Sequence, residues 1–575
     1  MLKLIHIQMS GIILGIANLD ERSHDNAACL IKKGRLVAQA EEERFTREKH
    51  AYDSMPTKAI SFCLDRANVK GEDLDTISVG WNLPDTLFDN VSTPIDCSRE
   101  RILKALFPED DLTNSNVDIQ FIPHHLAHAA SVYYSSGFKD AAILVIDGAG
   151  ELDATSLWKG NGKDLQLIKT WSYDPHSLGF MFEGVSQYLG FRGSDAGKVM
   201  GLAAYHQDKV PPFPNVNFND GYNITFTDFF KKSVLESARK KLHYWLMDIV
   251  VDYWTKYCEE LFGPREKMLA LDNNIVHPQK AQVAARLQET LERVVLSLAK
   301  YAKELTGSKN LCLTGGVALN CSANGFLEKQ AMFESLYINP AAGDSGVALG
   351  SALFTHYNLD NQPALSNLSE LSQSPFWGPE FSDSEIKAFL ESLAISFKEC
   401  DDDYKNVAEL IERGQIIAWF QGAMEIGPRA LGARSILADP RNPNNLAKVN
   451  KIKEREPWRP LAPSILHGYE AEFFTPAICS PFMLKAATVL GNRRSRIPAV
   501  VHTDGSSRYQ SVLKEFNPRY WQLIEGFRKL TGIPLVLNTS FNHHEPIVCT
   551  PKDAYRTFQN RAIDHLVMGK YIINK

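Results

Sequence analysis

Three apolar segments that each run into a glycine-rich loop constrain the fold of this chain most. They read VIDGAGE at 145–151, LTGGVALNCSANG at 313–325 and AAGDSGVALGSAL at 341–353. Glycine lets backbone N–H groups approach phosphate oxygens, and a helix that follows adds a favourable dipole. One such loop is often only a tight turn, but three of them predict a nucleotide site in an α/β domain. The residues predicted to contact the nucleotide there are Gly148, Gly315, Gly316, Asn320 and Gly343.

Neither of the two common phosphate-binding motifs is present in these loops. None of them matches the P-loop pattern G-x-x-x-x-G-K-[ST] or the dinucleotide pattern G-x-G-x-x-G. Further strands are predicted at 11–20 and in a pair about a Lys-Gly turn within 27–50. Apolar residues at three- and four-residue spacing predict a helix over 280–306, ended by Gly307. The first part of the chain is therefore predicted to alternate strands and helices.

The length of the chain, 575 residues, predicts more than one domain, because a single core stops growing at about 250–300 residues. The predicted domains are residues 1–360 and residues 384–575, and the second restarts with a helix at 403–413 and a strand at 415–420. Residues 361–383 belong to a stretch rich in Asn, Pro and Ser and are predicted to form the linker. No short internal repeat is visible.

Composition and charge exclude several classes of protein. A hydrophobic fraction of 44% with 23% charged residues indicates an ordinary globular protein, and a net charge of −6 disfavours nucleic-acid partners. The nine cysteines form no C-x-x-C, so neither a zinc ribbon nor a disulfide framework is indicated. No apolar run reaches the roughly 20 residues that span a bilayer. The apolar start lacks a small-residue cleavage site, so we expect a cytoplasmic protein without membrane partners, begun at Met1 or Met9.

A group of histidines and carboxylates predicts a metal site. His124 and His128 lie four residues apart, which places them on one face of a helix. Asp147 and Asp344, each at the end of an apolar strand, are suited to supply oxygen ligands from neighbouring loops. The alternative is a pair of helix histidines that bond only to backbone or water. Three histidines in five residues beside acidic strand ends favour the metal.

The C-terminal part of the chain carries a basic group suited to phosphate. The segment EIGPRALGARSI at 425–436 places two arginines beside glycines, and KVNKIKEREPWRPLAPS at 448–464 adds a run of cations. Such a run is usually a solvated helix face, but here it ends in a stiff Pro-Trp-Arg-Pro segment. Arginine binds phosphate through a planar fork, and lysine binds it as a point charge. The cations of these two segments are Arg429, Arg434, Lys448, Lys451, Lys453, Arg455 and Arg459.

In combination these motifs resemble the O-carbamoyltransferase family, which includes the nodulation-factor, cephamycin and aminoglycoside-tailoring enzymes. The resemblance covers nearly the whole chain, and its most specific motifs are HHLAHAA at 124–130 and IGPRALGARSI at 426–436. The other motifs are SHDNAA (23–28), EEERFTREKH (41–50), TGGVALN (314–320), GDSG (343–346), EPWRPLAPS (456–464) and NTSFN (538–542). It implies an N-terminal domain of the actin-like ATPase superfold, similar to the universal tRNA threonylcarbamoyl-transferase, followed by a YrdC-like α/β domain.

The resemblance also implies a two-step reaction and a role for each motif. The C-terminal domain would form carbamoyl-adenylate from carbamoyl phosphate and ATP with Mg²⁺, and the N-terminal domain would transfer the carbamoyl group to a hydroxyl of a small natural product. For the first step it implies phosphate contacts by Arg429, Lys453, Arg459 and Arg508, with Asn538 and Ser540 at the carbamoyl end. For the second it implies Fe(II) or another divalent metal on His124, His128, Asp147 and Asp344, with His24 and Lys49 nearby.

Several points stay open at this level. Ser23 replaces the glycine usual in the first motif, which leaves the detail of that loop in doubt. The base for the acceptor hydroxyl is unassigned, although a carboxylate within 206–280 is a candidate. The acceptor pocket is expected to be lined by residues 81–120 and 205–280, whose aromatic side chains either stack on the acceptor or form helix core. These aromatic residues are Phe226, Phe229, Phe230, Tyr244, Trp245, Tyr253 and Trp254.

Three other functions compete with carbamoyl transfer. A sugar or acetate kinase of the same superfold explains the glycine loops but leaves the histidines and the second domain without a role. Threonylcarbamoyl transfer to tRNA shares both domain types but requires a basic surface that the composition does not provide. A nucleotide-gated interaction module does not require the EPWRPLAPS or NTSFN motifs. Oligomeric state is not predicted.

Overall fold

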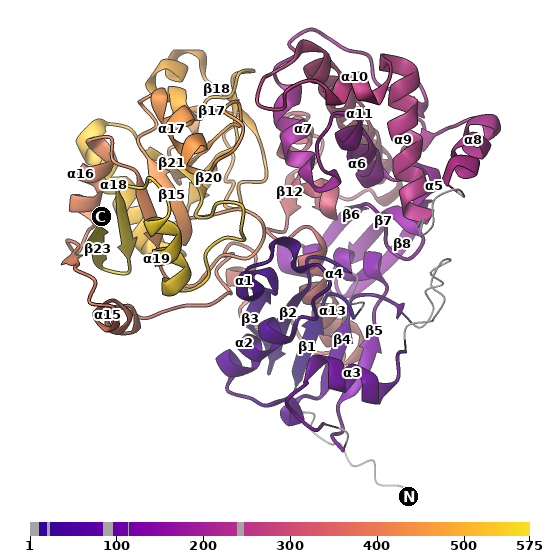
Figure 1. Cartoon of the computed structure of the whole chain (residues 1–575). Helices are drawn as coiled ribbons and strands as arrows, with labels where there is room; N and C mark the ends of the chain where they lie inside the picture. The colour runs from indigo at the N-terminus through magenta and orange to yellow at the C-terminus, as the bar shows by residue number, and fades with distance from the viewer. Residues whose placement is uncertain (1–10, 20–22, 84–95, 113, 239–245) are drawn as a thin grey trace, which may run out of the picture.

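The computed structural model describes residues 11–19, 23–83, 96–112, 114–238 and 246–575 (Figure 1). The apolar chain start, with both Met1 and Met9, lies outside these residues. The chain forms three lobes around a common centre, two from its N-terminal part and one from its C-terminal part (Figure 1).

The first lobe is built on a five-stranded mixed sheet with the order β3-β2-β1-β4-β5. Strands β1 to β3 pair antiparallel, whereas β4 pairs parallel with β1 and β5 parallel with β4. The Lys-Gly turn between β2 and β3 is confirmed. The strands are β1 (Ile12–Ile16), β2 (Ala27–Lys32), β3 (Arg35–Glu41), β4 (Thr76–Val79) and β5 (Asp118–Phe121).

The second lobe repeats this topology in a sheet with the order β12-β11-β6-β7-β8. Again three strands pair antiparallel in succession, and two later strands join parallel to the first of them. This doubled sheet is the arrangement of the actin-like ATPase superfold, so the predicted fold is confirmed. The strands are β6 (Asp140–Ile146), β7 (Asp153–Asn161), β8 (Asp164–Ser172), β11 (Asn310–Thr314) and β12 (Ser335–Ile338).

Two helices pack against each other between the sheets and carry residues of the predicted site. Helix α4 (His124–Ser136) begins with the histidine motif, and α13 (Val347–Phe354) follows the GDSG loop. The predicted long helix is confirmed as α11 (Pro278–Thr306), which Gly307 ends with a positive φ of 65°. The other helices of these lobes include α1 (Glu43–Thr46), α2 (Thr57–Ala67), α3 (Arg99–Leu106), α6 (Leu178–Tyr188), α7 (Ala196–Ala203), α8 (Asp228–Ala238), α9 (Leu246–Phe262), α10 (Arg265–Leu269) and α12 (Cys321–Lys329).

The C-terminal lobe is built on an eight-stranded mixed sheet with the order β13-β23-β22-β14-β15-β21-β16-β20. Its strands are β13 (Lys398–Glu399), β14 (Ile417–Phe420), β15 (Arg434–Ala438), β16 (Ala462–Leu466), β20 (Gln510–Val512), β21 (Leu535–Ser540), β22 (His565–Met568) and β23 (Tyr571–Asn574). Its helices are α15 (Asp383–Ser392), α16 (Lys405–Glu412), α17 (Asn444–Ile452), α18 (Pro518–Thr531) and α19 (Pro551–Gln559). The predicted helix and strand at its start are confirmed as α16 and β14. That this lobe is YrdC-like stays a prediction.

The segment predicted to be a linker packs against the first lobe. The side chain of Asn367 accepts a hydrogen bond from the Leu36 N–H and donates one to the Leu36 carbonyl. Leu371 and Trp377 are buried in a cluster that also contains residues of β1 and β2. Three buried apolar side chains, those of Leu365, Leu371 and Trp377, hold the segment against this lobe. The domain boundaries themselves stay a prediction.

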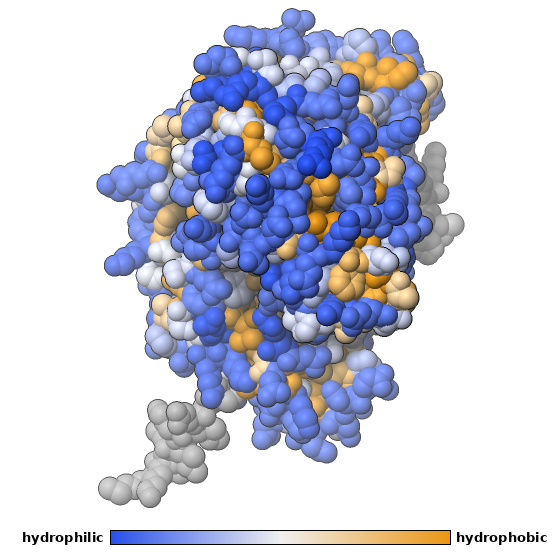
Figure 2. Space-filling model, turned by 90° about the vertical axis from the view of Figure 1, so that its left-hand side faces the viewer, coloured by the Kyte–Doolittle hydropathy of each residue, from blue (hydrophilic) through white to orange (hydrophobic). Residues whose placement is uncertain are grey.

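The exterior gives no sign of a membrane-spanning element in the described part of the chain. Within these residues no helix combines the length and the apolar character needed to cross a bilayer. On the face in Figure 2, apolar residues occur in scattered groups between hydrophilic ones.

Close packing of α13 on α4 yields a first prediction. A Cβ added at Gly350 would lie 1.8 Å from the Ala127 carbonyl oxygen, so the helices must separate to accept it. We expect Gly350→Ala to destabilise the protein by about 3 kcal/mol, the upper end of the usual cost of overpacking. Thermal unfolding followed by circular dichroism measures this. Gly491→Ala is the control, since its Cβ meets no atom within 4 Å, and equal melting temperatures for the two variants would contradict the prediction.

Candidate functional site

A cavity of about 560 Å³ lies where the two N-terminal lobes meet the C-terminal lobe. Its volume is within the usual range for small-molecule sites. The strand ends of β6, β11 and β12 open into it from one side, and the 425–434 and 538–542 segments open into it from the other. The predicted site residues that line it are Lys49, Asp147, Gly148, Gly316, Asn320, Gly343, Asp344, Arg429, Arg459, Arg508, Asn538 and Ser540.

The four predicted metal ligands come together at the N-terminal wall of this cavity. Their ligand atoms all lie within 4.8 Å of one another. The His128 Nε2 atom lies 3.1 Å from Asp147 Oδ2 and 3.7 Å from Asp344 Oδ1. The His124 Nε2 atom lies 3.4 Å and 3.8 Å from the same two oxygens. The helix supplies both histidines and two strand ends supply the carboxylates, as the sequence predicts.

Hydrogen bonds on the far side of each ring aim the histidines at the centre of this cluster. His124 Nδ1 lies 3.2 Å from the Gly80 carbonyl oxygen, which only accepts, so the ring proton is on Nδ1. His128 Nδ1 lies 3.4 Å from the Thr314 hydroxyl, whose own proton goes to the Ala342 carbonyl. Metal-binding histidines are held in this way.

In their neutral form, the two rings therefore direct two lone pairs toward a carboxylate oxygen. The two Nε2 atoms and Asp147 Oδ2 are buried and have no hydrogen-bond partner among the described residues. Imidazole nitrogens with hard oxygen ligands suit iron, zinc or manganese in the divalent state. The residues present thus fit a divalent cation, although its identity stays a prediction.

The pKa shifts within the cluster also indicate that a positive charge is stabilised there. Burial lowers the pKa of His128, but the Asp147 and Asp344 carboxylates outweigh burial and raise it to about 9. Burial raises the pKa of Asp147, but the two histidines outweigh burial and hold it well below its ordinary range. The neighbouring His125 faces Ser156 instead, and burial lowers its pKa to about 3. On this helix, positive charge is therefore stabilised at His128, which faces Asp147 and Asp344, and not at His125.

The glycine loops differ from the prediction in what their backbone groups do. The N–H groups of Gly148 and Gly316 both donate to Asp147 Oδ1, at 2.8 Å and 3.1 Å. Gly315 has a positive φ of 89°, and a Cβ there would lie 2.3 Å from the Ile146 carbonyl oxygen. The Asn320 side chain caps α12 by accepting from the Ala323 N–H. The structure therefore shows these residues shaping the histidine–carboxylate cluster and the loop, and their contact with a nucleotide stays a prediction.

Several arginine side chains lie close together at the C-terminal wall of the cavity. Arg429, Arg455, Arg459 and Arg508 all line it. Burial and the neighbouring guanidinium groups lower the pKa of Arg429 to about 9, and burial with Arg459 does the same for Arg455. Cations packed this closely destabilise one another, so an anion among them is stabilised. Arg455 was not among the phosphate ligands implied by the resemblance, although it lies in the basic run that the sequence singled out.

The Pro-Trp-Arg-Pro segment is fixed by the N-terminal lobes. The Trp458 indole donates to the Asn273 carbonyl at 3.1 Å, and the Tyr205 hydroxyl donates to the Trp458 carbonyl at 3.0 Å. Trp458 also contacts the Phe191 ring. Arg459 follows this anchor directly, so the N-terminal lobes fix the backbone from which it enters the cavity.

Lys453 organises the loop after β21. Its buried Nζ donates to the Ser540 carbonyl at 2.5 Å and to the Asn542 carbonyl at 3.0 Å, and it also contacts both side chains. Burial and the nearby arginines lower its pKa well below the ordinary value. The predicted role at phosphate is thus accompanied by a structural one. Asn538 donates to the Ala430 carbonyl and the Ser464 hydroxyl, and its buried Oδ1 is left unpaired.

Like Lys453, three other cations of the basic segments are not among the residues that line the cavity. Arg434 is buried in the C-terminal lobe, where it stacks on Phe420 and donates to the Gln421 carbonyl. Lys448 and Lys451 are exposed. The sequence grouped them with the others because charge alone does not show which side of a strand or helix faces the ligand.

The motif position His24 belongs to a short network with Asp25 and His50, and Lys49 precedes His50 in the chain. His24 Nδ1 lies 2.9 Å from Asp25 Oδ2, and His50 Nδ1 lies 2.8 Å from Asp25 Oδ1. Burial raises the pKa of Asp25, but the two histidines outweigh burial and lower it. Lys49 and His50 line the cavity, whereas the half-exposed His24 is at its edge.

The predicted acceptor-lining segments do not line this cavity. None of its lining residues lies in the described parts of 81–120 or 205–280. Phe226, Phe230, Tyr253 and Trp254 pack on one another in the core instead. Phe229 is exposed, and Tyr244 and Trp245 lie outside the described residues. The helix-core alternative is therefore confirmed for the four packed rings.

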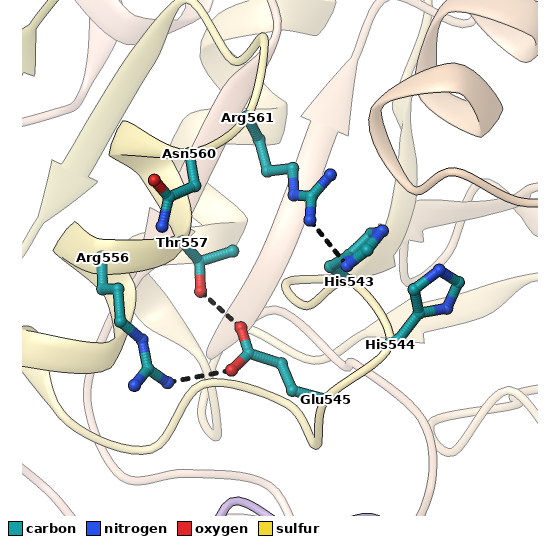
Figure 3. Close-up of a pocket in the computed structure, with 7 residues that line it drawn as sticks. All are labelled: His543, His544, Glu545, Arg556, Thr557, Asn560 and Arg561. Carbon is teal, nitrogen blue, oxygen red and sulfur yellow. Dashed lines mark hydrogen bonds and ion pairs between the residues drawn. The ribbon is translucent and has the colours of Figure 1, made fainter.

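A second group of potential ligands, Glu454, His543 and His544, lies beside a small surface pocket (Figure 3). Arg561 donates to His543 Nδ1 at 2.7 Å, which leaves the ring proton on Nε2. The Nε2 atom lies 2.7 Å from Glu454 Oε2. A histidine in this tautomer has no free lone pair for a metal, so we assign none here.

The sequence and the fold of this chain are similar to those of several known proteins. Residues 13–94 and 99–353 match the family model described as Carbamoyltransferase N-terminus, and residues 408–575 match Carbamoyltransferase C-terminus. The nodulation protein NolNO of Sinorhizobium fredii is 36% identical over 98% of this chain and 82% of its own. The nodulation protein NolO of Bradyrhizobium diazoefficiens is 34% identical over 79% of this chain and 78% of its own. The structure of T. kodakarensis HypF matches 61% of this chain and 48% of its own, at 13% identity and a TM-score of 0.31.

The structure joins a doubled actin-like sheet to a C-terminal α/β lobe across a shared cavity. Both family models match, and together they cover most of the chain. The chain therefore belongs to the carbamoyltransferase family.

Loss of one histidine should remove the cation. We expect the purified protein to bind about one Fe²⁺ or Mn²⁺ per chain, and His128→Ala to weaken binding more than about 100-fold, since it removes a direct ligand. Equilibrium dialysis under anaerobic conditions measures both. His125→Ala is the matched control on the same helix, and an equal loss in the two variants would contradict the assignment.

Proposed function

We propose that this carbamoyltransferase activates a carbamoyl group with ATP in its C-terminal lobe and transfers it to a hydroxyl of a small-molecule natural product. Carbamoyl phosphate is the donor, and Mg²⁺ accompanies ATP. The activated species is carbamoyl-adenylate, formed among the arginines and used at the histidine cluster.

The activation step suits the arginine wall of the cavity. Water cleaves carbamoyl phosphate to carbamate and phosphate, and a carbamate oxygen then attacks the α-phosphorus of ATP. Pyrophosphate leaves, and carbamoyl-adenylate remains. This step gathers several negative groups, which Arg429, Arg459 and Arg508 stabilise from fixed positions. Asn538 and Ser540 bind the small carbamoyl end.

The transfer step suits the opposite wall. The acceptor oxygen attacks the carbamoyl carbon, the bond to the adenylate phosphate breaks, and AMP leaves as the hydroxyl loses its proton. His124, His128, Asp147 and Asp344 would hold a divalent cation there, which as a Lewis acid supplies charge stabilisation to the phosphate. Lys49 adds a positive charge between the two walls.

One observation carries the proposal: the four arginines and the two carboxylates of the histidine–carboxylate cluster, Asp147 and Asp344, line the same cavity. A carbamoyl-adenylate made at one wall can therefore reach the other without entering bulk water, which would hydrolyse it. A kinase of the same superfold requires no second phosphate-binding wall.

Pyrophosphate release from ATP and carbamoyl phosphate, without an acceptor, tests the activation step. We expect release that depends on carbamoyl phosphate. If none occurs, the same assay with candidate hydroxyl compounds shows whether the acceptor is required. Formation of ADP without pyrophosphate would overturn the proposal and favour a kinase.

Two substitutions separate the half-reactions. We expect Arg459→Ala to lower pyrophosphate release at least about 100-fold, because it removes a fixed charge at the forming phosphates. We expect His128→Ala to retain pyrophosphate release and to lose carbamoylated product. Lys451→Ala, a change of an exposed cation, is the control. If Arg459→Ala and His128→Ala impair the same half-reaction, the division of labour between the lobes is wrong.

A further inference from the structure

We propose that Arg47, with Arg44 beside it, is a positioning residue for the activation site, although both belong to the N-terminal part of the chain. They lie in the 41–50 segment, which contains α1 and follows β3. This inference rests on the proposed function, because it assigns the activation step to the two C-terminal loops that the segment contacts. These are the 425–434 loop and the 538–547 loop.

Arg47 fixes the far end of the 538–547 loop. Its guanidinium donates to the Ile547 carbonyl at 2.7 Å and to the Pro546 carbonyl at 2.6 Å. It also lies 3.4 Å from the Glu545 carboxylate. Arg47 ends α1 with a positive φ of 65°, and its side chain is only 16% exposed. Two carbonyl contacts by one planar group define the loop position better than a single bond does.

The same loop is held from the C-terminal lobe at its other points. Lys453 binds the Ser540 and Asn542 carbonyls, and the Asn542 side chain donates to the Glu545 carbonyl at 2.7 Å. Figure 3 shows the Glu545 carboxylate between Arg556 and Thr557 of α19, at 2.9 Å and 2.7 Å. Arg47 therefore completes a set of contacts around the loop that presents Ser540 to the cavity.

Arg44 acts on the 425–434 loop in a parallel manner. Its guanidinium donates to the Gly427 carbonyl at 2.9 Å, and Glu41, paired with Arg44 at 3.3 Å, accepts from the Gly427 N–H at 2.6 Å. Both polar groups of the Gly427 backbone are thus bound by the 41–50 segment. Arg429 lies two residues further on, so its entry into the cavity depends on this contact.

The 41–50 segment also reaches the transfer side. It ends at Lys49 and His50, which line the cavity, and His50 binds Asp25. The segment is thereby placed to keep the arginine wall in register with the histidine cluster. A misplacement of about 1 Å at a reacting group is enough to cost up to about 100-fold in rate.

Arg47→Ala tests the proposal, because Arg44 is more deeply buried and its loss threatens folding. The assay is the exchange of labelled pyrophosphate into ATP that depends on carbamoyl phosphate. We expect kcat/KM for carbamoyl phosphate to fall between about ten-fold and one hundred-fold, with the KM for ATP changed little. Guanidinium ion, at concentrations far below those that unfold proteins, should restore part of the loss. Arg47→Lys keeps the charge but loses the planar guanidinium fork. We expect its kcat/KM for carbamoyl phosphate to lie between the values of the wild type and of Arg47→Ala.

Arg66→Ala is the matched control. Arg66 is a half-exposed arginine of α2 that pairs across to Glu380 at 3.0 Å, away from both loops. We expect it to retain wild-type constants.

Two results with Arg47→Ala would overturn the proposal. One is unchanged exchange constants. The other is a loss that is equal for both substrates, follows the folded fraction by circular dichroism and is not rescued by guanidinium. The absence of exchange in the wild-type enzyme would instead overturn the proposed function on which this inference rests.

Discussion

Two backbone N–H groups donate hydrogen bonds to one oxygen of Asp147, and the arrangement of the histidine–carboxylate cluster depends on this contact. Gly148 follows β6 and Gly316 follows β11, so the two donors come from neighbouring parallel strands. With Oδ1 bound in this way, Oδ2 is turned toward His124 and His128. Glycine is required at Gly315 because its positive φ lets the chain pass close to β6. The sheet register thereby fixes one ligand, and the packing of α4 fixes two more.

At the arginine wall of the cavity the electrostatic situation is the opposite, because positive charges are crowded together and repel one another. Four guanidinium groups share a partly buried cavity, and burial with mutual repulsion lowers the pKa of Arg429 and Arg455. Such a wall persists because its arginines are tied to backbone held by other parts of the molecule. Trp458 is anchored in the N-terminal lobes, and Gly427 is bound by Arg44 and Glu41. Contacts at the interface between the lobes therefore help to hold these crowded cations together, and Glu456 pairs with Arg459 at 3.5 Å.

Sequence patterns predicted individual strands and helices better than they predicted how these elements pair and pack. The strand-to-glycine segments, the helix ended by Gly307 and the histidine pair on one helix face were all predicted, because each depends on local periodicity or on one residue type. These local patterns did not predict the doubled topology, since two sheets of the same order need share no sequence repeat; only the family resemblance implied it. The segments expected to line the acceptor pocket do not line the cavity described above, so their role stays a prediction. An aromatic side chain such as Trp254 has the same pattern whether it faces a ligand or the core.

The sequence by itself determined the chemistry available: histidines and carboxylates for a cation, arginines for phosphate, and glycines at strand ends. It also determined the family, because those motifs occur together along one chain. Only the tertiary structure decided which cations face the cavity, separating Arg429 and Arg459 from the buried Arg434. It alone showed that Arg47 contacts a loop 500 residues away in the chain. The physical reason is that residue type and spacing fix local conformation, whereas burial and long-range contacts depend on how distant elements pack.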